Sequence, residues 1–191
     1  MNFDVVKEIV EYGRSIEDKY GKKFRFTMTT NGILLNDEIA SYINEHMHNA
    51  VLSLDGRKEI NDKMRVRTGG QGSYDNIVPK FVKMAEDRNH MDYYVRGTFT
   101  SNNLDFSNDV LHLADLRFKQ ISVEPVVTDE NEAYAIRKED LPIIFEEYEK
   151  LAKEILKRRE RGQWFNFFHF MIDLTGGPCA HKRLVGCGSG T

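Results

Sequence analysis

The chain has 191 residues, which is enough for one well-buried domain and short for two. Its net charge of −3, from 27 basic and 30 acidic side chains, provides no basic face for nucleic acid. The chain opens with no charged segment ahead of an apolar core, and no apolar run reaches the roughly 20 residues that cross a bilayer. We therefore expect a cytoplasmic protein that binds neither nucleic acid nor membrane.

Helical and extended segments alternate along the chain. Helical spacing of apolar residues predicts helices over 3–20, from a cap at Asn36 to about 47, from Ser73 onward, over 106–117 and over about 140–161. Period-two patterns and turn signals predict strands near 24–30, 50–55, 93–100 and 120–126. Repeated strand–helix units favour parallel strands that are neighbours in sequence order, with right-handed crossovers, in a doubly wound sheet or a (β/α) barrel. With only four strands and a helix first, we expect a piece of a larger sheet, truncated at both ends.

Polar side chains share one face of the predicted strands. Ser53, Asp55, Arg96 and Glu124 each lie opposite their aliphatic neighbours, near the strand ends where βα loops build active sites. A structural hydrogen-bonded layer explains any one of them, but an unpaired arginine is costly to bury, so the set predicts a ligand site. Arginine binds a carboxylate bidentately, and serine and aspartate bind ribose hydroxyls. The expected ligand therefore carries a carboxylate and hydroxyl groups.

The two cysteines, Cys179 and Cys187, lie close to the end of the chain. A cytoplasmic location disfavours a disulfide between them. Two thiolates are half of the four ligands of a closed zinc or iron–sulfur site. They are either plain thiols or half of a metal site, and the glycines on both sides of Cys187 favour metal ligands. Just before them, the aromatic run 164–170 is typical of a core segment, with His169 as a hydrogen-bonded structural histidine.

The strand-end motifs, taken in order, resemble radical S-adenosylmethionine (SAM) enzymes with a SPASM extension. These motifs are Thr29-Thr30-Asn31-Gly32, Ser53-Leu54-Asp55-Gly56, Arg65 and Gly69-Gly70-Gln71-Gly72-Ser73-Tyr74. Gly177-Pro178-Cys179 and Gly186-Cys187-Gly188 look like the opening of the extension. Within this family the chain is most similar to the thioether-forming maturases of six-cysteine (SCIFF) ribosomal peptides.

The resemblance implies a fold and a set of cofactor contacts. The fold is a partial (β/α)6 radical SAM-type barrel with helices on its outer face. Residues 1–162 form its central and C-terminal part, and residues 163–191 lead into a truncated SPASM domain. Ser53 contacts the ribose of SAM and Arg96 its methionyl carboxylate. The same rim also contains Asp55, Thr30, Asn31 and Glu124. Cys179 and Cys187 are the first two ligands of an auxiliary [4Fe–4S] cluster.

The function implied by the resemblance is peptide or protein maturation. A reduced cluster, fed by an electron donor protein, cleaves SAM, and the 5′-deoxyadenosyl radical takes a hydrogen from the substrate. A cysteine sulfur is then joined to a peptide carbon as a thioether. The family's CxxxCxxC triplet and its Gly-Gly-Glu-Pro strand end are absent from this sequence and would precede Met1. The chain alone is therefore expected to be inactive.

Two other classes of function stay open at this stage. A (β/α)-barrel aldolase or isomerase would use Glu124 as a base and Arg96 to hold an anionic substrate. A non-catalytic partner-binding domain would use the aromatic run 164–170 as its contact. That third class predicts an exposed apolar patch and no convergence of polar side chains at the strand ends.

Overall fold

A parallel sheet forms the centre of the molecule in a computed structural model, which describes residues 2–171. Its strands stand in the order in which they occur along the chain, and each pairs in parallel with the next. They are β1 (Thr27–Thr30), β2 (Asn49–Ser53), β3 (Tyr93–Phe99), β4 (Gln120–Pro125) and β5 (Asn166–Phe167). The four expected strands and their order are confirmed. The short β5, within the aromatic run, was not predicted.

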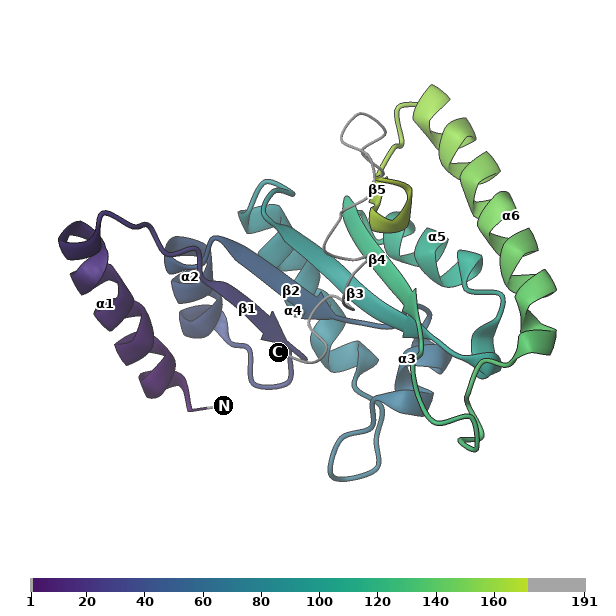
Figure 1. Cartoon of the computed structure of the whole chain (residues 1–191), viewed down its shortest axis with the longest axis horizontal. Helices are drawn as coiled ribbons and strands as arrows, with labels where there is room; N and C mark the ends of the chain where they lie inside the picture. Colours follow the sequence, from purple (N-terminus) through teal and green to yellow (C-terminus); the bar gives the residue numbers. More distant parts are fainter. Residues whose placement is uncertain (1, 172–191) are drawn as a thin grey trace.

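Helices connect the strands and cover one side of the sheet (Figure 1). They are α1 (Phe3–Tyr20), α2 (Asp37–His46), α3 (Lys58–Met64), α4 (Tyr74–Asp87), α5 (Ser107–Asp115) and α6 (Leu141–Glu160). Three short 3-10 helices of the described residues lie between these elements or after them, namely η1 (Ser101–Asn103), η2 (Lys138–Asp140) and η3 (Phe168–Phe170). As predicted, Asn36 caps α2, its side chain accepting a hydrogen bond of 2.8 Å from the Ile39 amide. Helix α3 was not among the predicted helices.

The hydrophobic core lies between the sheet and these helices. Leu52, Val95 and Val123, on three adjacent strands, have no exposed surface and belong to one cluster with Phe81 of α4 and Leu113 of α5. Alternate residues of the same strands turn to the other face. Within residues 2–171 the architecture is therefore that of (β/α) units with helices outside, as predicted for a partial barrel, and the sheet does not close. The doubly wound alternative is wrong.

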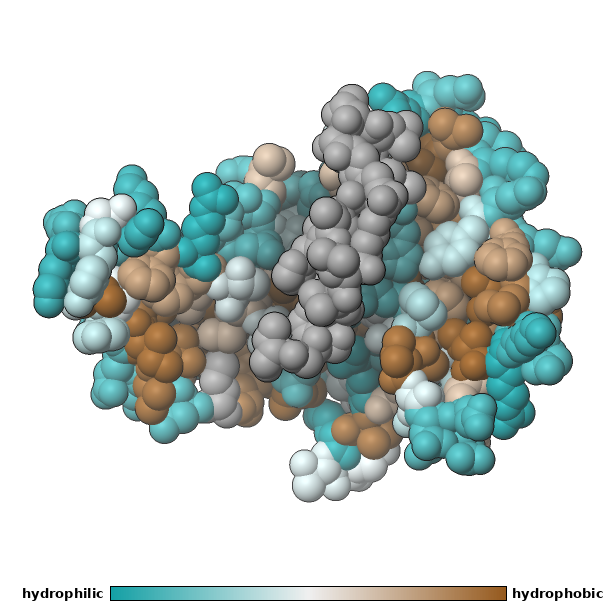
Figure 2. Space-filling model, viewed as in Figure 1, coloured by the Kyte–Doolittle hydropathy of each residue, from teal (hydrophilic) through white to brown (hydrophobic). Residues whose placement is uncertain are grey.

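The surface combines hydrophilic areas with hydrophobic patches. Figure 2 shows hydrophilic residues over much of one face and hydrophobic patches near α1 at one end and near α6 at the other. The exposed large hydrophobic residues of these two helices are Val5, Ile9, Tyr12, Tyr20, Leu141, Ile143, Phe145 and Leu156. None of the helices described is both long and apolar enough to span a membrane.

Candidate ligand site at the carboxyl edge of the sheet

A row of polar side chains crosses three adjacent strands. In the strand register, Ser53 of β2 pairs with Arg96 of β3, and Arg96 pairs with Ser122 of β4. All three lie on the face opposite Leu52 and Val95, as their alternation predicted. Because parallel strands lie roughly 4.8 Å apart, one small ligand can contact both Ser53 and Arg96, whereas Ser122 is buried. We call this set, together with Glu124, the polar row.

Arg96 is the cation of the polar row and is held by Glu124. Its Nη2 donates to Glu124 Oε2 at 2.7 Å and its Nε to Oε1 at 3.3 Å, while Ser122 Oγ donates to Oε1 at 3.1 Å. The hydrogen bond from Arg96 lowers the pKa of Glu124. Arg96 was expected to be a buried arginine without a partner in the protein. That premise is wrong, because the side chain is 52% exposed and paired.

Asp55 connects β2 to its neighbours. Its side chain is 5% exposed and accepts two hydrogen bonds from Arg65, from Nε at 2.7 Å and Nη2 at 2.8 Å. It also accepts the Thr98 backbone N–H of β3 at 3.0 Å. Arg65 follows directly after α3, so this ion pair fixes the loop that begins there to the carboxyl end of β2. The carboxylate is thus saturated by protein donors.

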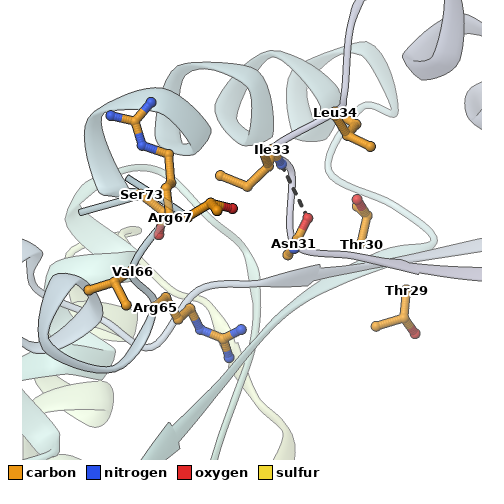
Figure 3. Close-up of a pocket in the computed structure, with 10 residues that line it drawn as sticks. Thr29, Thr30, Asn31, Ile33, Leu34, Arg65, Val66, Arg67 and Ser73 are labelled. Atoms are coloured by element: carbon orange, nitrogen blue, oxygen red, sulfur yellow. Dashed lines mark hydrogen bonds between the residues drawn. The ribbon is translucent and has the colours of Figure 1, made fainter. Parts of the chain in front are cut away.

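Thr30 and Asn31 shape the turn after β1. The hydroxyl of Thr30 accepts the Gly32 N–H at 3.1 Å, and Asn31 Oδ1 accepts the Ile33 N–H at 3.3 Å (Figure 3). Gly32 has φ of +75°, and a Cβ there would lie 2.6 Å from the ring of Phe81. Only glycine fits this turn without strain. Asn31 is exposed, and its side-chain nitrogen donates no hydrogen bond to any of residues 2–171.

A pocket of about 760 Å³ opens between this turn and the loop after α3. Figure 3 shows the two walls facing each other across it. Its lining residues are Thr29, Thr30, Asn31, Ile33, Leu34, Arg65, Val66, Arg67, Thr68 and Ser73. Thr30 and Asn31 were predicted site residues. Thr29 and Arg65 belonged to the quoted motifs but were not assigned to the site, and Arg67 was not singled out. The signal available for Arg65 was the need of a buried Asp55 for a cation.

The aromatic run splits between the core and the surface. Phe165 and Phe167 are buried, as predicted for a core segment. The core interpretation is wrong for Trp164 and Phe168, which are 50% and 61% exposed. Alternate residues turn to opposite sides around the short strand β5, and the Phe168 ring stacks on Tyr94, its centroid at 6.3 Å, on the face that carries the polar row.

His169 is the hydrogen-bonded histidine that the sequence predicted. The hydroxyl of Tyr148 in α6 lies 2.9 Å from its Nδ1. Burial lowers the pKa of His169, although the nearby Glu124 carboxylate opposes this. Within residues 2–171, no group of three or more His, Cys, Asp or Glu side chains could hold a metal ion. Cys179 and Cys187 lie outside the described residues.

Two observations weigh against the alternative functions. The pKa of Glu124 is lowered by its hydrogen bond from Arg96, which makes its carboxylate a weaker base than an ordinary glutamate. This opposes the aldolase or isomerase interpretation. The partner-binding interpretation predicted exposed apolar surface, which the structure does have. It also predicted no polar convergence at the strand ends, whereas the register aligns Ser53, Arg96 and Ser122. The arrangement is that of an open (β/α) barrel with a row of polar side chains at the carboxyl edge of its strands.

Comparison with known proteins identifies the fold. No family model matches the chain. It is 26% identical, over 123 residues, to a cysteine-type anaerobic sulfatase-maturating enzyme of Clostridium novyi (strain NT). The aligned region covers 63% of this chain and 32% of that protein. The solved structure of native anSMEcpe with bound AdoMet matches with a TM-score of 0.73 at 18% identity, over 88% of this chain and 46% of that one.

Two further solved structures have the same architecture. Native anSMEcpe with bound AdoMet and Kp18Cys peptide matches with a TM-score of 0.75 at 17% identity, over 88% of this chain and 47% of that one. Streptococcus suis SuiB bound to S-adenosylmethionine matches with a TM-score of 0.52 at 18% identity, over 83% of this chain and 35% of that one. The chain therefore spans about a third of the curated relative and less than half of these solved chains. The predicted resemblance to radical SAM maturases and the partial barrel fold are confirmed.

Proposed function

We propose that this chain is part of a radical SAM enzyme that modifies a peptide or protein. The observation that carries the proposal is the polar row, which lies at the carboxyl edge of a partial barrel similar to that of AdoMet-bound anSMEcpe. The structure of that enzyme with a bound peptide supports a peptide as the substrate class. When bound, SAM supplies a 5′-deoxyadenosyl radical after reduction by a [4Fe–4S] cluster.

The residues of the polar row fit a ligand with a carboxylate and hydroxyl groups. Glu124 engages Nε and Nη2 of Arg96, and within residues 2–171 no protein acceptor contacts Nη1. Arg96 is thus oriented in advance and has a free donor for the methionyl carboxylate of SAM. Ser53, its neighbour across the strand pair, offers a hydroxyl to the ribose.

The other predicted cofactor residues support the same rim. Asp55 accepts hydrogen bonds from Arg65 and from the Thr98 amide, and the bond from Thr98 joins the carboxyl ends of β2 and β3. Thr30 fixes the turn after β1, and Asn31 presents its amide nitrogen beside it. In this proposal they hold the shape of the cofactor site, and Glu124 holds the guanidinium of Arg96.

The test is the affinity of the full-length protein for SAM after Arg96→Ala, with Arg25→Ala as the matched control. Arg25 is exposed just before β1, at the opposite end of the strands. A charge-assisted hydrogen bond contributes about 1.5–3 kcal/mol, so we expect Arg96→Ala to weaken SAM binding about tenfold to a hundredfold. The control should bind as the unmodified protein does. Equal affinities for the two variants would contradict the role of Arg96.

The finer proposal concerns the chemistry and the segment 163–191. We propose that the product is a cysteine thioether in a ribosomal peptide, that an electron donor protein supplies reducing equivalents, and that the enzyme is cytoplasmic. Cys179 and Cys187 are proposed as ligands of an auxiliary [4Fe–4S] cluster of a SPASM domain. Replacing both with alanine in the anaerobically produced full-length protein should remove about four iron atoms per chain, because such a cluster needs four ligands. An unchanged iron content would refute the SPASM assignment.

A further inference from the structure

The pocket beside the polar row has hydrogen-bond donors and no acidic residue in its lining. Arg65 and Arg67 line one side, and the hydroxyls of Thr29 and Thr68 add further polar groups. The charge of Arg65 is met by Asp55. Arg67 donates through Nε to the Gly72 carbonyl at 3.2 Å and forms no ion pair with any part of the chain that the structure describes. The pocket therefore carries a net positive charge.

Several of these donors are oriented and free. Asp55 engages Nε and Nη2 of Arg65, which fixes the plane of the guanidinium and leaves Nη1 without an acceptor among residues 2–171. Asn31 accepts the Ile33 N–H through Oδ1, so its amide nitrogen is the group available to a ligand. In Figure 3, Arg65 extends toward the Asn31 side of the pocket. Because Arg65 is already fixed, binding an anion costs less side-chain entropy there than at a flexible surface arginine.

The pocket also has an apolar wall. Leu34 and Val66 are 58% and 59% exposed, on opposite sides of the opening, and Ile33 lies beside Leu34. A ligand that fills the pocket therefore joins an anionic group to an apolar group. An extended peptide with an acidic group next to an apolar residue has this composition, whereas inorganic phosphate lacks the apolar part.

The position of the pocket makes it a site for a second ligand next to the first. Thr29 pairs in register with Val51, so it lies on the same face of the sheet as Ser53. Asp55 forms the connection between the two sites, since it binds Arg65 of the pocket and the Thr98 amide beside the polar row. A group bound in the pocket lies beside a ligand bound to Ser53 and Arg96, which is the arrangement that a reaction between cofactor and substrate requires.

We propose that this pocket binds a carboxylate of the peptide substrate, with an apolar residue of the same peptide against Leu34 and Val66. This inference rests on the proposed peptide-modifying function. The carboxylate comes either from an acidic side chain or from the C-terminus of the peptide.

Three short peptides test the inference in the full-length protein saturated with SAM. The first is Gly-Ser-Leu-Glu-Cys-Ser-Gly with an amidated C-terminus, the second has Gln in place of Glu, and the third has that Gln and a free C-terminal carboxylate. Ligand-observed NMR titration gives their affinities. We expect the first or the third peptide to bind at least about fivefold more tightly than the second, since hydrogen bonds to charged groups contribute about 1.5–3 kcal/mol. Which of the two does so identifies the source of the carboxylate.

Asp55 neutralises Arg65, so the net charge of the pocket comes from Arg67. Arg67→Gln should therefore abolish this preference, and Arg67→Lys should keep most of it. Arg25→Gln, which removes the same charge at the far end of the strands, should leave it intact. Arg67 is exposed, and the backbone hydrogen bonds of its loop, from Arg67 N–H to Gln71 and from Gly70 N–H to Arg67, persist in these variants, so folding is retained. Absence of any preference in the unmodified protein, or a preference that survives Arg67→Gln, overturns the inference.

The affinity for SAM, measured for the same proteins in separate titrations that start without SAM, separates this inference from the proposed function. Under the inference, SAM affinity is the same in Arg67→Gln and in the unmodified protein. A loss of SAM affinity in Arg67→Gln would show that the pocket holds part of the cofactor, and would overturn the assignment to peptide. A protein that binds no SAM at all would refute the proposed function, whatever its preference among the peptides.

Discussion

Two of the bidentate arginine–carboxylate pairs, Arg65–Asp55 and Arg96–Glu124, differ in burial, and their removal should have different consequences. The carboxylate of Asp55 is 5% exposed and that of Glu124 is 35% exposed. Arg65→Ala leaves the Asp55 carboxylate buried, with the Thr98 amide as its remaining hydrogen-bond donor among those described. Breaking a buried ion pair costs about 3–5 kcal/mol, and the 30% exposure of Arg65 places the expected loss near 3 kcal/mol.

Arg96→Ala is the matched control for stability. Glu124 is exposed enough to recover hydration, so the expected loss is about 1 kcal/mol or less, as for surface ion pairs. Urea unfolding followed by circular dichroism measures both variants. With a slope of about 1–3 kcal/mol per molar urea, Arg65→Ala should lower the midpoint by at least about 1 M. The Asp55→Ala/Arg65→Ala double variant should lose less stability than the two single variants combined. Equal losses for Arg65→Ala and Arg96→Ala would refute the reasoning that burial determines the cost.

Two further predictions concern a glycine and the response to pH. Gly56→Ala should destabilise the protein by about 2 kcal/mol or more, because φ is +139° and the new Cβ would lie 2.4 Å from Asp109 Cβ. Gly21→Ala is the control, since Gly21 has φ of +58° and open space around it. In the same urea assay it should cost about 1 kcal/mol. Arg96 lowers the pKa of Glu124 below its ordinary 4.5, so the stability that this pair contributes is present above about pH 4.5 and is lost as the pH falls through the lowered pKa. The stability difference between the unmodified protein and Glu124→Gln should therefore shrink between about pH 6 and pH 3.5, and a difference that grows instead would contradict the assigned sign.

The sequence predicted those features that depend on local periodicity. Alternation along the strands correctly separated Leu52 and Val95 from Ser53 and Arg96, because side chains of a strand alternate between faces in any sheet. The cap at Asn36 was predicted because it depends only on residues within one turn of α2. The strand order followed from the parallel crossovers between successive units.

The features that the sequence could not predict depend on contacts between distant residues. The hydrogen bond from Arg65 to Asp55 joins residues on either side of α3, and the polar composition of 58–64 gave no helical pattern to predict that helix. Arg96 and Glu124 are 28 positions apart in the sequence. Strand β5 has two residues, too few for a period to emerge. The pocket combines residues from two loops, and no periodicity relates Thr29 to Arg67.

The order of the strands also bears on how the chain acquires its structure. Every strand pairs with the one directly before it, so no strand has to wait for a partner from the far end of the described chain. Contacts close in sequence involve little loop-closure entropy and favour rapid folding. Each unit can therefore add to the edge left by the previous one as the polypeptide leaves the ribosome, at about 5–20 residues per second. On this route the Asp55–Arg65 pair forms before β4 has been synthesised, whereas the Arg96–Glu124 pair completes only when β4 docks.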